Sequence, residues 1–252
     1  ATIEFTEDGT YSFEIAYSDK AGNEAEVVKT ESFSMDKTEP EISFEGVEDK
    51  GAYKEDVTPV IVCRDENLDA STLKVQVDMV NQNNSTIQPE EALGEIKSSG
   101  DMCMMTLNNP EYVRENDGIY IITASVMDLA GNEQEETICY SVNRFGSIYT
   151  LQEEAKRVAG NYVKGSQAIS IVETNADEIS AEDVKVKLTK NGQVSELTQG
   201  EDYIREENLD DGSWKQYTYT ISEDNFVDDG VYMVSISSKD KAGNYNENAA
   251  GE

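Results

Sequence analysis

Oxygen ligands for hard metal ions are abundant in this chain. Of its 252 residues, 52 are Asp or Glu, 20 are Lys or Arg, and none is His. Carboxylate oxygens are ligands that Ca²⁺ prefers, and Ca²⁺ tolerates irregular coordination. The candidate ligands that we single out are Asp8, Asp36, Asp65, Glu66 and Asp128. Calcium is therefore the candidate cofactor, and the alternative is that these residues are solvated turn and cap residues.

Catalytic chemistry finds little support in the same inventory. Without histidine, Ser-His-Asp triads and His-containing metal clusters cannot form, and no phosphate-binding loop or zinc-ligand spacing occurs. Glycoside hydrolysis by two carboxylates needs a cleft, which a narrow sandwich seldom provides. We therefore expect that the chain is not an enzyme.

The formal net charge of −32 bears on the partners. Such a chain repels phosphate backbones and anionic lipid head groups, so nucleic acids and membrane surfaces are poor partners. No run of 18 apolar residues is present, so we expect no membrane insertion. We also expect an interior part of a longer protein, whose other domains are its partners.

Trp214 is the only tryptophan and a candidate for glycan binding. It alternates out of phase with Tyr217 and Tyr219, which the strand pattern places in the core. An exposed aromatic ring beside carboxylates can stack on a sugar face, and the alternative is a ring that covers the core.

Two short motifs recur together three times and divide the chain into similar units. An Asp-Gly-x-Tyr sequence is followed by Asp-x-Ala-Gly-Asn, the two aspartates lie 11 positions apart in every copy, and the copies are 109 and 112 residues apart. The copies are Asp8 to Tyr11 with Asp19 to Asn23, Asp117 to Tyr120 with Asp128 to Asn132, and Asp229 to Tyr232 with Asp240 to Asn244. Repeats of this length are independently folding domains rather than solenoid turns.

Alternating apolar and polar residues between the two motifs predict half-buried antiparallel strands. Asp-Gly-x-Tyr predicts a tyrosine corner, in which the tyrosine hydroxyl bonds back to the preceding loop, and Asp-x-Ala-Gly-Asn predicts a hairpin turn. The predicted fold is all-β, with tandem immunoglobulin-like β-sandwiches of about seven antiparallel strands each.

The predicted units are 1–35, an incomplete repeat with the last strands only, then 36–143 and 144–252, the last with its final strand missing or cut. Matching the two full units pairs Asn67 with Asn175 and places Cys63 and Cys103 in the core of neighbouring strands. We expect all three cysteines to be free thiols, although a bond between Cys63 and Cys103 is geometrically conceivable.

These motifs, together with the linker Asp36 to Pro40, resemble bacterial immunoglobulin-like repeats of large cell-surface proteins. The resemblance implies an extracellular location on the bacterial surface and a role as a non-catalytic stalk or spacer that presents other domains. The alternative is a recognition module that binds a host protein or a glycan, in an adhesin or in an extracellular carbohydrate-active enzyme.

In a tandem of such sandwiches, the first junction would bring Asp8, Asp36 and Glu39 near Asp65, Glu66 and Asp128, which predicts calcium there. At the second junction Arg144, Thr174 and Asn175 replace carboxylates. We therefore expect the two junctions to differ.

Overall fold

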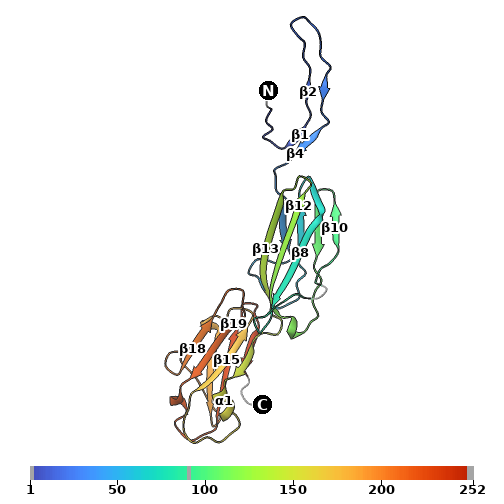
Figure 1. Cartoon of the computed structure of the whole chain (residues 1–252). Coiled ribbons are helices and arrows are strands. Elements are labelled where there is room, and N and C mark those ends of the chain that lie inside the picture. The colour runs from blue at the N-terminus through green and yellow to red at the C-terminus, as the bar shows by residue number, and fades with distance from the viewer. Residues whose placement is uncertain (1–2, 90–91, 249–252) are drawn as a thin grey trace.

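The computed structural model describes residues 3–89 and 92–248, which form a hairpin followed by two sandwiches arranged end to end (Figure 1). We call residues 1–35, 36–143 and 144–252 units one, two and three. Their boundaries stay predictions, but no sheet mixes strands from two units within the described residues. None of the helices there is long and apolar enough to cross a membrane.

Unit two is a two-sheet sandwich. Its strands within the described residues are β5 (Glu41–Glu45), β6 (Ala52–Tyr53), β7 (Val60–Arg64), β8 (Leu68–Val80), β9 (Thr86–Ile87), β10 (Ile96–Ser99), β11 (Met102–Thr106), β12 (Gly118–Asp128) and β13 (Glu133–Val142). One sheet has the order β10-β11-β7-β5 and the other β6-β13-β12-β8-β9. A short 3-10 helix, η1 (Arg114–Asn116), precedes β12.

Unit three repeats this plan. Its described strands are β14 (Ile148–Leu151), β15 (Ile169–Asn175), β16 (Lys185–Lys190), β17 (Gln193–Glu196), β18 (Tyr203–Asn208), β19 (Lys215–Ile221), β20 (Tyr232–Lys239) and β21 (Tyr245–Asn248). The sheet orders are β14-β15-β19-β18 and β17-β16-β20-β21. The helices are α1 (Glu153–Val158), η2 (Ala181–Asp183) and η3 (Glu223–Phe226).

The chain is all-β and built of immunoglobulin-like sandwiches, because sequence neighbours such as β7 and β8, or β11 and β12, lie in opposite sheets. The expected number of about seven strands is too low, since the described parts contain nine strands in unit two and eight in unit three. The additional strands are short edge strands. β6 adds to β13 in parallel, and β9 and β17 extend the sheets beside β8 and β16.

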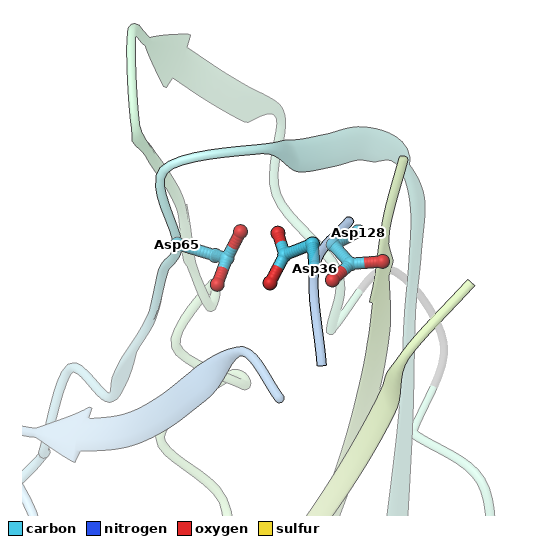
Figure 2. A group of neighbouring side chains, drawn as sticks. All are labelled: Asp36, Asp65 and Asp128. Carbon is cyan, nitrogen blue, oxygen red and sulfur yellow. The ribbon is translucent and has the colours of Figure 1, made fainter. Parts of the chain in front are cut away.

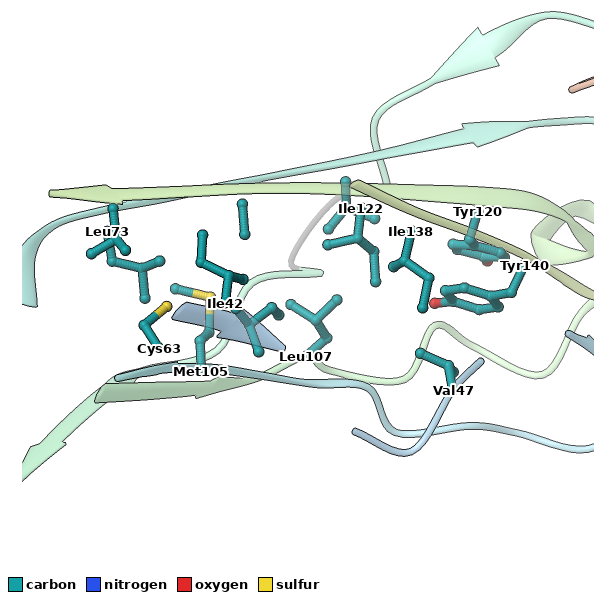
Figure 3. Close-up of a cluster of buried hydrophobic side chains, with 14 of the residues drawn as sticks. Ile42, Val47, Cys63, Leu73, Met105, Leu107, Tyr120, Ile122, Ile138 and Tyr140 are labelled. Carbon is teal, nitrogen blue, oxygen red and sulfur yellow. The ribbon is translucent and has the colours of Figure 1, made fainter. Parts of the chain in front are cut away.

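The core of unit two lies between its sheets and is lined by the inward side chains of every second strand residue (Figure 3). Cys63 on β7 and Cys103 on β11 are directly opposite each other, and both are fully buried free thiols. Burial and the neighbouring Cys103 raise the pKa of Cys63 to about 12. They fill core positions, as predicted.

Unit one is a single projecting hairpin. Its strands are β1 (Gly9–Tyr11), β2 (Glu14–Ile15), β3 (Val28–Lys29) and β4 (Phe33–Met35), and β1 pairs with β4 and β2 with β3. None of its described residues is buried, although Phe5, Tyr11 and Phe33 form a small ring cluster. An isolated hairpin of this kind is too small to bury a core of its own.

The final strand of unit three, expected to be missing or cut, is present in a short form, because β21 has four described residues and its counterpart β13 in unit two has ten. Strand β21 follows the last Asp-x-Ala-Gly-Asn turn and pairs antiparallel with β20, from Lys239 opposite Tyr245 to Ile236 opposite Asn248. The weak apolar alternation of this segment obscured it, because only Asn246 of β21 is buried.

The tyrosine corner is confirmed in all three units. The hydroxyl groups of Tyr11, Tyr120 and Tyr232 donate to the backbone oxygen four residues earlier, at 2.8, 2.7 and 2.7 Å. Each bond fixes the loop that leads into the hairpin with the Asp-x-Ala-Gly-Asn turn of its unit. In unit two the ring also stacks on Tyr140, with 5.6 Å between centroids.

Tyr120→Phe should lower the free energy of unfolding of unit two by about 1 kcal/mol, because a partly buried hydrogen bond to the Asn116 carbonyl is lost. Scanning calorimetry of the full chain measures this. Tyr162→Phe is the matched control, since Tyr162 is fully exposed. An unchanged midpoint for Tyr120→Phe would contradict a stabilising corner.

Candidate metal centre

Asp128 is positioned by the turn that follows β12. Its Oδ1 accepts from the backbone amides of Gly131 and Asn132 at 2.7 and 2.8 Å, and its Oδ2 accepts from Asn132 Nδ2 at 2.6 Å. Gly131 has φ +93°, which favours glycine. Burial acts to raise the pKa of Asp128, but these hydrogen bonds outweigh it and hold the pKa below its usual value. The carboxylate is therefore ionised at neutral pH.

Asp36 reaches the same place from the linker between units one and two. Asn132 Nδ2 donates to the backbone oxygen of Asp36 at 3.2 Å, and Asn67 Nδ2 donates to its Oδ2 at 2.6 Å. Its Oδ1 accepts from the Thr38 amide at 3.1 Å. The linker is thus tied to two loops of unit two.

Asp65 follows β7, and its backbone amide donates to Asp101 O at 2.9 Å. Its Oδ1 accepts from the Asn67 amide at 2.7 Å. Asn67 therefore contacts Asp65 through its backbone and Asp36 through its side chain. In the sequence analysis Asn67 served only to align the two full units, and its contacts with Asp36 and Asp65 were missed, for which its place two residues after a carboxylate at a strand end was the available signal.

Asp36, Asp65 and Asp128 each contribute one carboxylate oxygen to a group in which these atoms lie within 4.8 Å of one another (Figure 2). Asp128 is buried, and the other two are half-buried. We call Asp36, Asp65, Asn67 and Asp128 the first cluster. Three like charges so close repel one another, and a hard divalent cation with oxygen ligands would relieve that repulsion.

Two other predicted ligands take no part in this group. Asp8 instead fixes the linker, because its Oδ1 accepts from the Lys37 amide at 2.9 Å and its Oδ2 from Thr38 Oγ1 at 2.6 Å. Glu66 is exposed. Calcium binding by the predicted residues stays a prediction.

Trp214 is not exposed, so the expectation of an open stacking platform is wrong. Its side chain is 3% exposed and packs with Val80, Ile119 and Ala176. Its Nε1 donates to Val80 O at 2.9 Å. The ring does point away from the core of unit three, as its alternation predicted, but unit two covers it.

No family model and no curated protein matches the chain. Among solved structures it is similar to a tetra-tandem repeat in the extending region of a large adhesion protein, with 15% identity and a TM-score of 0.43 over 96% of this chain and 55% of that one. The chain therefore spans about half the length of that solved repeat segment.

Two further similar structures contain immunoglobulin domains or a butyrophilin. The complex of Dpr2 Ig1-Ig2 with DIP-Theta Ig1-Ig3 matches at 12% identity and a TM-score of 0.40, over 96% of this chain and 71% of that one. Bovine butyrophilin matches at 12% identity and 0.33, over 82% and 96%. Strand order and pairing define the fold of units two and three.

Without divalent cations, Asp65→Asn should stabilise unit two by about 1 kcal/mol, or roughly 4–8 °C, because one of three neighbouring charges is removed. The amide keeps an oxygen that can accept from the Asn67 backbone. Calorimetry in chelator measures the shift.

Glu135→Gln is the control, since it removes one charge at an exposed position of β13. Equal shifts for the two variants would show that the stabilisation comes from lowering the net negative charge of the chain and not from lowering the repulsion within the first cluster. The difference between them should shrink in high salt.

Proposed function

We propose that this chain is a non-catalytic spacer segment of an extracellular protein of the bacterial cell surface, which holds other domains of the same protein away from the surface. The observation that carries the proposal is the end-to-end order of units along an elongated chain (Figure 1). Short linkers join the units, and each is hydrogen-bonded to the units on both sides. Such a chain transmits position over distance without needing an active site.

The acidic composition fits this role. A net charge of −32 keeps an extended protein soluble and discourages adhesion to nucleic acid or anionic lipid. The alternative is a recognition module that binds a host protein or a glycan, and Trp214 is the one residue named for it, on the assumption that its ring is exposed. Because that ring is buried between units two and three, we propose the spacer alone.

Calcium binding is the second part of the proposal. A Ca²⁺ ion held by Asp36, Asp65 and Asp128 would tie the linker to the loops after β7 and β12. Asp36 lies in the linker, so the ion would act on the angle between units one and two. Water or backbone oxygens would complete the coordination, as is usual for Ca²⁺.

The test is small-angle scattering and calorimetry of the full chain in calcium and in chelator. Calcium should raise the unfolding temperature of unit two and narrow the range of shapes, because binding to the native state stabilises it. Asp36→Asn should lose most of this response, since only two carboxylates remain.

Asp211→Asn removes an exposed carboxylate in unit three and should respond to calcium like the unchanged chain. Identical profiles and melts in calcium and chelator would overturn the metal site and leave the spacer proposal intact. A compact particle in both conditions would overturn the spacer itself.

A further inference from the structure

The second joint, where units two and three meet, contains a buried polar network. Asn143, which ends unit two, is fully buried, and its Nδ2 donates to Asn175 Oδ1 at 2.8 Å, Asp177 Oδ2 at 3.0 Å and Asp240 Oδ2 at 3.0 Å. Ser141 Oγ of β13 also donates to Asp177. We call Asn143, Asn175, Asp177 and Asp240 the second cluster.

The linker residues of the two joints correspond. Asn132 donates to the backbone oxygen of Asp36 at 3.2 Å, and Asn244 donates to that of Asn143 at 2.7 Å. In both joints the aspartate of Asp-Gly-x-Tyr accepts from the backbone amide of the following linker residue. Asp8 accepts from Lys37 at 2.9 Å, and Asp117 accepts from Arg144 at 2.8 Å. Asn143 therefore stands where the first joint has Asp36.

The loop residues correspond as well. Asp65 Oδ1 accepts from the Asn67 amide, and Asn175 Oδ1 accepts from the Asp177 amide, both at 2.7 Å. Thus Asn175 matches Asp65, and Asp177 matches Asn67. Asp128 and Asp240 occupy the same turn position.

The linker side chain presents a negative carboxylate to the first cluster and the partly positive hydrogens of a neutral carboxamide to the second. In the first, the Asp36 carboxylate faces Asp65 and Asp128. In the second, the amide hydrogens of Asn143 face two carboxylates and a carbonyl oxygen. If the oxygen and nitrogen of the Asn143 amide exchanged places, Oδ1 would face the three acceptor oxygens of Asn175, Asp177 and Asp240. The observed orientation avoids this repulsion and leaves Asn143 Oδ1 buried without a hydrogen-bond partner within the described structure.

An apolar contact completes the second joint. Trp214 lies in the loop before β19, outside the core of unit three, and packs on Val80 and Ile119 of unit two. Its backbone amide donates to Asn84 Oδ1 at 2.8 Å and its Nε1 to Val80 O at 2.9 Å. Lys241 Nζ adds a bond to Lys50 O at 2.9 Å.

We infer that units two and three form one rigid body, whose joint is locked without a metal ion by the Asn143 carboxamide and by Trp214. The contrast with a metal-dependent first joint rests on the calcium binding proposed above. The lock itself rests only on the contacts of the second joint. Interdomain motion is the default for tandem domains, so rigidity at one joint is a specific claim.

The lock can be tested by pulsed EPR on the full chain in chelator. Spin labels are placed at exposed positions 135 on β13 and 206 on β18, through Glu135→Cys and Glu206→Cys. Cys139→Ala removes the partly exposed thiol and keeps an apolar side chain against the Trp214 cluster, while Cys63 and Cys103 are buried. A single narrow distance is expected, and it should not change when calcium is added.

Asn143→Asp should lose the narrow distance, because a third carboxylate is then set against Asp177 and Asp240. Burial and the Asp240 charge already raise the pKa of Asp177 against the opposing bonds from Ser141 and Asn143. Asn161→Asp is the matched control and should keep the narrow distance, since the Asn161 amide donates to the backbone oxygens of Arg157 in α1 and of Ala159, away from the second joint.

Trp214→Ala keeps the test decisive if Asn143→Asp fails to fold. It removes the apolar seal and leaves the core cluster of unit three intact, so circular dichroism should stay native while the distance broadens. A broad distance in the unchanged chain, or a narrow one in folded Asn143→Asp or Trp214→Ala, would overturn the lock. Because every sample is in chelator, failure of calcium binding at the first cluster would leave this result unaffected.

Discussion

The clamp on each linker is the constraint on which the rest of the structure depends. One side of the clamp is the aspartate of Asp-Gly-x-Tyr in the preceding unit, which binds the amide of Lys37 or Arg144. The other side is the asparagine of Asp-x-Ala-Gly-Asn in the following unit, which binds the carbonyl oxygen one residue earlier, in Asp36 or Asn143. The two motifs are therefore the two faces of a joint as well as local loop signals. Their constant spacing within a unit keeps both faces at the ends of the same hairpin.

At the position of Asp36 and Asn143 the clamp binds only the backbone oxygen, so the residue type there can differ between the joints. At the first joint the side chain at this position is a carboxylate, and the nearby positions are also acidic. The repulsion between these carboxylates therefore depends on the salt concentration. At the second joint the side chain is a carboxamide, whose hydrogens compensate the carboxylates around it. Arg144, the next residue, does not enter the second cluster. It turns back to unit two and binds Asp117 and Asp56 at 2.9 and 2.8 Å.

Local patterns in the sequence predicted the parts of the fold that depend on contacts between residues close in sequence. The tyrosine corners and the glycine turns follow from residues within a few positions of one another, and all three copies form. The register of the earlier strands was harder. Cys63 lies opposite Cys103, whereas Glu173 lies opposite Tyr217, so Glu173 is the counterpart of Cys63 and the pairing of Asn67 with Asn175 was wrong by two residues. A buried glutamate that accepts from Tyr149, Tyr219 and Ser238 has no apolar signature to align.

Burial that comes from a neighbouring unit could not be predicted from the pattern of one unit. Trp214 alternates like an exposed residue because unit three does not cover it, and only the approach of Val80 and Ile119 makes it part of a core. The same limit applies to Asn67 and Asn143, whose side chains act on residues 31 to 97 positions away. Asn143 thus looks like an ordinary turn residue in the sequence, although its side chain sets the rigidity that we infer for the second joint. In a repeat protein the fold is encoded within each unit, whereas the stiffness of the chain is encoded in a few side chains that differ between otherwise equivalent positions.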